Sequence, residues 1–423
     1  MYRSLLSSIV LALALSTSAQ QYVHQVLVLS EGYFDFGTQT QVTPVTLYSY
    51  DTSQGTVQSV AVINDARFGT HVQVHGPFIY VAADSFLLKY DADTYTLLDM
   101  EIVTGIRRLD FWNDKLILSR GEVGGLPHYL EVRDKNTFDL DYIVAPADGL
   151  AYSGEDVAVV GDKAYIAVNN GFDWGNAVGF VGILDMVNGN YSQIDLGPDG
   201  INPENIMVDG NRLWTLNNKD FTGSSVSRVD LVNGTLDVTA NIAVGSGCAA
   251  SELAQEKVYY MEYAVGQVAR YDVNAESVVD TLTGSTSIYG LVNDPLNNLL
   301  YTTTTDFFSI GELFNMSYTG TMTSLGAVGP NPGKLALDIR GSQDVNENSA
   351  APFFLAPDPA VDAVLVVSNI PITNSMLVLD ATGRVAASMV GDGSQQMQID
   401  VSALAPGQYT LLVNGAAHRF TKL

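Results

Sequence analysis

Apolar and polar residues alternate in short runs along most of the chain, with turns rich in Gly, Asn and Asp between them. Residues 71–103 show the pattern well: runs at 71–75, 78–81 and 87–91, the third ending in Asp, and then a fourth run to residue 103. Alternation with a period of two is typical of half-buried strands. The pattern therefore predicts an all-β fold made of four-stranded units.

The four-stranded unit repeats through the middle of the chain. Its third run ends in an apolar–Asp or Arg–Asp step at Tyr50-Asp51, Tyr90-Asp91, Arg133-Asp134, Leu184-Asp185, Val229-Asp230 and Tyr271-Asp272, and in Met316-Ser317 in the last unit. First strands are expected near residues 71, 107, 156, 205, 251, 288 and 334. Seven units of about 47 residues each match the size of a four-stranded propeller blade.

The two ends of the repeat complete each other. The first unit, at about residues 26–63, lacks a first strand, and the run at 334–339 has no unit after it. In a β-propeller the C-terminal strand often completes the N-terminal blade. We therefore predict a seven-bladed β-propeller over residues 20–340, closed by strand 334–339.

This region resembles the secreted seven-bladed propellers of the YVTN-repeat and quinoprotein-amine-dehydrogenase-like superfamily. The segment Leu29-Ser30-Glu31-Gly32-Tyr33 is similar to the Asn-Glu-Gly start of Bacteroidota surface propellers, with Ser30 in place of Asn. Some of those proteins bind corrinoids at the outer membrane. The resemblance implies the fold, and it leaves the ligand open.

The N-terminus predicts export. Arg3 is followed by an apolar run at 5–15 and by small residues at 16–19, the parts of a secretory signal peptide cleaved after Ala19. An apolar run of this length is too short to span a bilayer, which needs about 20 residues. No later segment is long and apolar enough to be transmembrane, so we expect a signal peptide at 1–19 and an exported, soluble product.

The C-terminal residues differ in character from the repeat. Residues 341–355 are expected to form a linker, and the alternating runs in 356–423 predict a small β-sandwich. The motifs of this segment, in order, are Asp358 flanked by prolines, Asp380 with Gly383-Arg384, Asp400-Val401-Ser402 and Pro406-Gly407-Gln408-Tyr409. They resemble the type A C-terminal sorting domain of the type IX secretion system of Bacteroidota, with Asp358 in place of an Asn.

The resemblance of residues 356–423 implies a route and a partner. The chain would pass through Sec export to the periplasm and then cross the outer membrane by the type IX machinery, to be secreted or held at the cell surface. An accessory β-sandwich that binds carbohydrate is the alternative.

Charge and cysteine content exclude several classes of partner and of metal site. The chain has 46 acidic and 20 basic residues, a net charge of −26, which argues against nucleic acid or an anionic membrane as partner. A single cysteine, Cys248, excludes an intrachain disulfide framework and a multi-cysteine metal site. His71 and His75 would lie about 13 Å apart on a strand, too far to share an ion. We predict no metal and no cofactor.

Long loops on one face of the propeller carry the candidate ligand-binding residues. They are Glu31, Tyr33, Arg67, Arg107, Arg120, Asn170, Trp174, Asn205, Asn218, Tyr263, Tyr289 and Asp306. Aromatic rings beside amides suit sugars, peptides or cofactor-like rings. The alternative is that these aromatics pack the loops together. The three arginines could hold an anionic group, or each could pair with an acid and brace adjacent blades.

We therefore expect an exported binding protein for a small molecule, glycan or peptide, with no catalytic residue assigned. The alternatives are a lyase or hydrolase acting on extracellular polymers and a structural or adhesive surface protein. An enzyme needs convergent acid–base groups. Glu31, Asp306, Glu262, Arg120 and His128 are its candidates on that face.

Overall fold

The computed structural model describes residues 21–219, 223–246, 251–341, 353–368, 371–373, 375–380, 384–413 and 416–423. The chain divides into two compact units, one of which is Tyr22–Arg340 and the other of which contains Gly341–Leu423. The predicted signal peptide at 1–19, most of the predicted linker and Cys248 lie outside the described residues. No helix among the described residues is long and apolar enough to cross a membrane.

The larger unit contains seven four-stranded sheets, the blades of a propeller, so the predicted fold class is confirmed. Blades 1 to 4 are β30 (Lys334–Gly341), β1 (Gln21–Ser30), β4 (Val45–Asp51), β5 (Thr56–Ile63); β6 (Gly69–His75), β7 (Phe78–Ala83), β8 (Phe86–Asp91), β9 (Leu97–Ile102); β10 (Ile106–Trp112), β11 (Lys115–Arg120), β12 (Leu130–Asp134), β13 (Leu140–Val144); β14 (Gly154–Val160), β15 (Lys163–Val168), β16 (Phe180–Asp185), β17 (Tyr191–Asp195). Blades 5 to 7 are β18 (Pro203–Asp209), β19 (Arg212–Asn217), β20 (Ser224–Asp230), β21 (Thr235–Ile242); β22 (Ser251–Ala254), β23 (Lys257–Glu262), β24 (Gln267–Asp272), β25 (Ser277–Leu282); β26 (Ile288–Asp294), β27 (Leu299–Thr304), β28 (Gly311–Ser317), β29 (Met322–Val328). A short hairpin of β2 (Tyr33–Asp35) and β3 (Thr40–Thr43) extends the β1–β4 loop, and one 3₁₀ turn, η1 (Pro146–Asp148), precedes β14.

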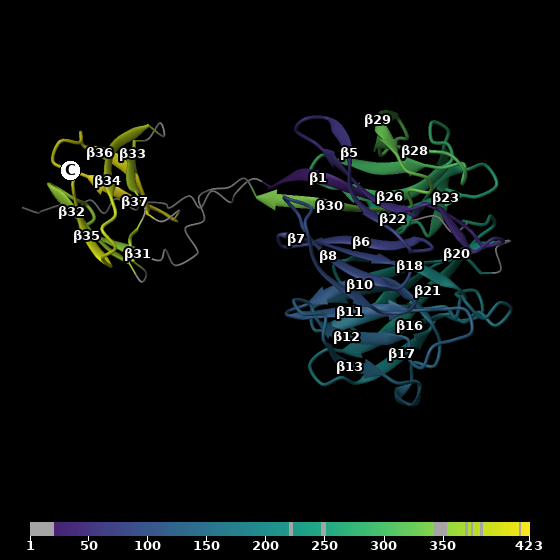
Figure 1. The fold of residues 1–423 in the computed structure, drawn as a ribbon. Coiled ribbons are helices and arrows are strands. Elements are labelled where there is room, and N and C mark those ends of the chain that lie inside the picture. The colour runs from purple at the N-terminus through teal and green to yellow at the C-terminus, as the bar shows by residue number, and fades with distance from the viewer. Residues whose placement is uncertain are drawn as a thin grey trace, which may run out of the picture. The chain divides into compact units, whose positions relative to one another are not determined.

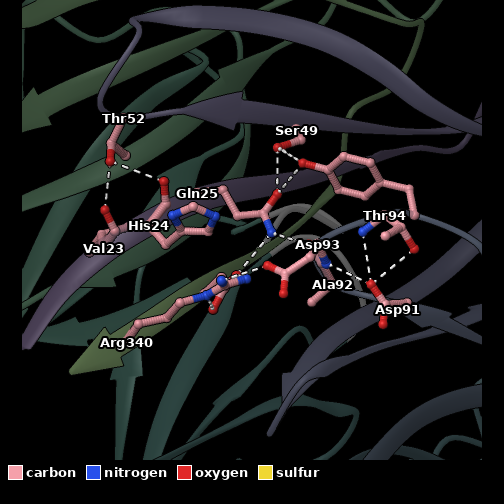
Figure 2. Close-up of polar contacts among 12 residues, drawn as sticks. Val23, His24, Gln25, Ser49, Thr52, Asp91, Ala92, Asp93, Thr94 and Arg340 are labelled. Atoms are coloured by element: carbon pink, nitrogen blue, oxygen red, sulfur yellow. Dashed lines mark hydrogen bonds and ion pairs between the residues drawn. The ribbon is translucent and has the colours of Figure 1, made fainter. Parts of the chain in front are cut away.

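Strands from the two ends of the propeller sequence close its ring. The green β30 lies beside the purple β1 and completes blade 1 (Figure 1). Around Gln25 of β1, a buried network ties this blade to blade 2 (Figure 2): its amide nitrogen donates to Asp338 Oδ2 and to Ala92 O at 2.9 Å each, and its oxygen accepts from Ser49. Arg340 adds an ion pair of 2.6 Å to Asp93. The closing strand is thus held by side chains as well as by sheet pairing.

In blades 1 to 6 the Asp at the end of the third strand caps a turn. Asp185 Oδ1 accepts hydrogen bonds from the backbone N–H groups of Val187 and Asn188, at 2.9 and 3.2 Å. The same pattern recurs at Asp51, Asp91, Asp134, Asp230 and Asp272. A short acidic side chain that accepts two turn N–H groups favours a tight reversal into the fourth strand. This explains why the sequence repeat is most regular at the Asp that ends the third strand.

Apolar residues from neighbouring blades pack into shared cores. Leu27 and Leu47 of blade 1 cluster with Val72 and Val81 of blade 2, and all four are buried. Equivalent clusters join later blades, such as blades 3 and 4. Because these apolar surfaces are buried between blades, the side chains that face the central channel are free to be polar.

The smaller unit is a β-sandwich, as predicted for the fold class. One sheet contains β31 (Phe353–Ala356), β32 (Ala363–Ser368) and β35 (Gln396–Asp400), and the other contains β34 (Val385–Val390), β33 (Ser375–Leu379), β36 (Gly407–Val413) and β37 (Ala416–Lys422). Asp358 Oδ1 accepts a hydrogen bond of 2.9 Å from Thr421 N. Since an Asn has an oxygen at this position too, Asp358 keeps the acceptor that the Asn of the family pattern would offer.

Candidate functional site

The innermost strands are irregular at the end where they enter the channel. In blades 2, 3, 4, 5 and 7 the pairing of the first and second strands shifts by one residue, which is a β-bulge. The residues within these bulges are Thr70, Arg107 with Arg108, Glu155 with Asp156, Glu204, and Tyr289. A bulge adds a residue to one strand and redirects side chains. Each of these bulge residues lines a cavity on the propeller axis.

Two connected spaces occupy the axis. The narrower, of about 310 Å³, is lined from all seven inner strands and is the channel itself. The wider, of about 840 Å³, is lined by the bulged strand ends and by loops, and we call it the mouth cavity. Arg108, Asn205 and Lys334 line both spaces and mark their junction. A volume of this size suits a small organic ligand.

One side of the mouth cavity is formed by a tight ion pair. Arg107 donates from Nε and Nη2 to the two carboxylate oxygens of Glu155, at 2.9 and 2.6 Å. Burial opposes ionisation of Glu155, but Arg107 holds the pKa of this carboxyl below its ordinary value. The guanidinium carbon of Arg107 also lies 5.1 Å from the centre of the Phe172 ring. The pair joins blade 3 to blade 4 at the cavity wall.

Two other carboxylates in the cavity are harder to ionise. Burial raises the pKa of Glu204 to about 7, while its carboxylate accepts a hydrogen bond of 3.1 Å from Asn218. Burial also raises the pKa of Glu31, which accepts a hydrogen bond of 3.1 Å from Tyr289. Because charge is costly away from water, both carboxyls are harder to ionise than exposed ones, and Glu204 changes protonation near neutral pH.

Lys334 and Arg108, the cations at the junction, make fewer hydrogen bonds than Arg107. Burial and the nearby Arg108 lower the pKa of Lys334 to about 8. Lys334 makes no hydrogen bond or ion pair with the residues that the structure describes. Arg108 Nη2 donates to Asn205 at 3.4 Å, but its Nε is buried without a hydrogen-bond partner.

An exposed loop borders the cavity. Residues 169–179, between β15 and β16, bring Phe172 and Trp174 to the cavity wall, and the Trp174 side chain is 91% exposed. Asn170 Nδ2 donates to Asn176 O at 3.0 Å and holds the loop in its turn. An exposed indole over a polar cavity offers a flat apolar surface for a ring-shaped ligand.

The structure brings half of the predicted site residues to the mouth cavity. Glu31, Arg107, Asn170, Trp174, Asn205 and Tyr289 line it. Tyr33, Arg67, Arg120, Asn218, Tyr263 and Asp306 do not. Of these, Asn218 lies just behind the wall through its bond to Glu204, and Tyr263 is 65% exposed in the β23–β24 turn. Asp306 caps its own loop, where bonds from Ser309 and Phe308 lower its pKa to about 2.

The two arginines outside the cavity brace loops. Arg67 bonds to Asp84 and Glu122, which come from loops of blades 2 and 3, with contacts of 2.5 and 2.6 Å. The buried Arg120 forms an ion pair of 2.6 Å with Glu131 and donates to Thr104 O. Arg107 also forms an ion pair, so each of the three predicted arginines has an acidic partner.

The acid–base candidates are scattered. Glu31 is the member of that set found in the cavity lining among the described residues. Arg120 Nη1 lies 2.5 Å from His128 Nε2, and neither residue lines either axial space. Glu262 accepts a hydrogen bond from Thr281 and also lies outside the lining. No group of three or more metal-ligating side chains occurs in the described ranges.

The sequence reasoning missed six charged residues that line the cavity: Arg108, Glu155, Asp173, Glu204, Lys219 and Lys334. A signal was present, because polar pairs stand at matching positions of consecutive blades, as Arg107-Arg108, Glu155-Asp156 and Glu204-Asn205. In a regular strand only one residue of each pair would face the channel. The bulges bring both into the axial spaces.

Comparison with known proteins identifies the smaller unit. Residues 355–423 match the model of the secretion system C-terminal sorting domain. The protein is thus a seven-bladed β-propeller followed by a type IX sorting domain, and it is a secreted or cell-surface protein. No curated protein matches the chain.

Several solved structures resemble the chain. They include the hydrazine synthase of Kuenenia stuttgartiensis (TM-score 0.49, 12% identity, 78% of this chain and 97% of that chain), BamB from Moraxella catarrhalis (0.43, 13%, 65% and 82%) and the dihydro-heme d1 dehydrogenase NirN in complex with DHE (0.49, 13%, 90% and 76%). Likenesses at these identities do not extend to function.

Proposed function

We propose that this protein is an exported binding protein whose ligand occupies the mouth cavity. The observation that carries the proposal is the set of inner-strand bulges, because they insert residues where the channel opens and every one of them lines an axial space. Bulges of this kind cost regular sheet pairing and are concentrated beside functional sites.

The ligand class follows from the lining. Aromatic surface at Phe172 and Trp174, amides such as Asn170 and Asn205, and several charged groups suit a small polar molecule, a glycan or a peptide. We further propose a signal peptide at 1–19, a linker at 341–355, and engagement of the type IX machinery through residues 356–423. The sorting domain supplies the route, and the propeller supplies the recognition.

A ligand screen tests the proposal. Purified protein is mixed with corrinoids, glycans and peptides, and a rise in melting temperature identifies ligands, since binding to the folded state stabilises it. Affinity is then measured by calorimetry for Trp174→Ala and for the control Phe308→Ala, which removes an aromatic that is 79% exposed but lies outside the cavity. We expect the first variant to weaken binding about tenfold and the second to leave it unchanged. Equal affinities in both variants would contradict the proposed site.

An enzyme on the same scaffold is the second candidate. The observation that favours it is Glu204, a carboxyl with a pKa of about 7 in the same cavity as Lys334. A group of this kind can act as a general acid or base near neutral pH. Incubation with acidic and neutral polysaccharides would release products that Glu204→Gln abolishes, whereas a binding protein leaves the polymers intact.

A further inference from the structure

Arg108 and Lys334, the two cations at the junction of the mouth cavity and the channel, have N–H groups that donate no hydrogen bond to any described residue. Arg108 Nε is buried, and Asp156 Oδ1 lies 3.9 Å from it, beyond hydrogen-bond distance. Lys334 lines both spaces without a hydrogen bond or ion pair in the described part of the chain. A buried donor without an acceptor, such as Arg108 Nε, is uncommon in folded proteins and calls for an explanation, and the partly buried Lys334 lies beside it at the same junction.

The other charged groups of the cavity are already matched. Arg107 spends two donors on Glu155, and Lys219 donates to Asp199 and Asn241 at 3.0 and 2.8 Å. The remaining carboxylates of the mouth cavity, Glu31, Asp173 and Glu204, accept hydrogen bonds from the neutral side chains of Tyr289, Asn176 and Asn218. What is left over at the junction is therefore hydrogen-bond donor capacity that carries positive charge.

We propose that Lys334 and Arg108 form a subsite for an oxyanion, a carboxylate or sulfate carried by the ligand of the mouth cavity. This inference rests on the proposed function and deepens it. Asp156 balances part of the charge of Arg108 at 3.9 Å but leaves Arg108 Nε without a hydrogen bond, and an anion at the junction would accept hydrogen bonds from this donor and from the Lys334 ammonium. Combined with the aromatic and amide lining, the subsite favours an acidic or sulfated sugar over a neutral one.

Matched probes test the subsite. Glucuronate and glucose share a ring and differ by the carboxylate, and a blocked dipeptide with a free or an amidated C-terminus offers the same anion from a peptide. Calorimetry is run on the full protein and on Lys334→Met, Arg108→Gln and the control Lys219→Met, whose lysine lines the same cavity but is already paired. We expect one carboxylate probe to bind about tenfold more tightly than its neutral twin. The first two variants remove that preference, and the control retains it.

Inorganic sulfate gives a second, ligand-independent measurement. When sulfate replaces chloride at constant ionic strength, we expect a rise in melting temperature of about 2 °C or more in the wild type and in Lys219→Met, and none in Lys334→Met or Arg108→Gln. Should one variant fail to fold, the other still decides the question. The inference is overturned if the wild type prefers no carboxylate probe and sulfate does not stabilise it, or if both variants behave like the wild type.

The two proposals can fail separately. A neutral ligand that depends on Trp174 but not on Lys334 would overturn the subsite and leave the mouth cavity as the binding site. Anion binding that Lys334→Met abolishes and Trp174→Ala leaves intact would sustain the subsite and count against the wider binding role.

Discussion

The two faces of the propeller are built by different rules, and blade 4 shows both. On one face, β14 turns into β15 at Gly161-Asp162, and Asp185 caps the turn after β16. On the other, β14 is bulged at its start and an eleven-residue loop at 169–179 separates β15 from β16. The first face repeats from blade to blade, and the second does not. An Asp cap that closes six of the seven blades in the same way leaves the opposite ends of the strands free to differ.

The largest loss of stability is expected from removal of β30, because this strand contributes residues to both faces of the propeller. β30 begins at the mouth with Lys334 and ends in the Asp338–Arg340 network. A chain ending at residue 333 loses an inner strand and exposes sheet edges, which costs about 5 kcal/mol or more and lowers the melting temperature by about 10 °C or more. A chain ending at residue 341 keeps the strand and should melt like the full-length propeller. Calorimetric scans compare the two, and equal transitions would rule out closure by β30.

A smaller change in stability is expected from the ionisation of Glu204 in the mouth cavity as pH is varied. Because burial raises the pKa of Glu204 from 4.5 to about 7, the folded state binds more protons than the unfolded state in this window. The contribution of Glu204 to stability is therefore present below pH 4.5 and is lost as pH rises through 7. Glu204→Gln should become more stable relative to wild type by about 3 kcal/mol at most between pH 4.5 and 8.

Denaturant unfolding at several pH values measures this difference. The control is Glu101→Gln, which changes an exposed carboxylate on the outer strand β9. A parallel offset for both variants would mean that Glu204 is ionised as easily as a surface acid.

The smallest effect is expected on the face of capped turns. Asp185→Ala removes the acceptor of two backbone N–H groups and should cost about 1–2 kcal/mol of unfolding free energy. Asp185→Asn keeps an oxygen in place and should cost less. Neither change should alter ligand affinity, since Asp185 lies outside the lining of both axial spaces. A loss of ligand affinity in Asp185→Ala would contradict the expectation that the face of capped turns does not contribute to binding.

The same contrast explains what could be predicted from sequence. The capped turns follow from a short acidic side chain at a fixed position, which a repeat makes visible, and so the seven blades were foreseen. Arg108 and Glu204 were not, because a one-residue shift in pairing decides which side chains face the channel, and the only sign of it in the sequence is a pair of adjacent polar residues where alternation expects one. The acidic partners of Arg67 and Arg120 could not be predicted either, because Glu122 and Glu131 become their neighbours only when the chain folds.

The position of β30 also sets an order in time. Polypeptides are made from the N-terminus onward, and domains generally fold as units once their segments are available. The closing strand ends at Gly341, and the sorting domain follows at 355–423. A chain that carries a complete sorting signal has therefore already produced every strand its ring requires, and a truncated chain that cannot close its ring also lacks the signal. Because the sorting domain comes last, a propeller whose synthesis stops early also lacks the segment that directs secretion.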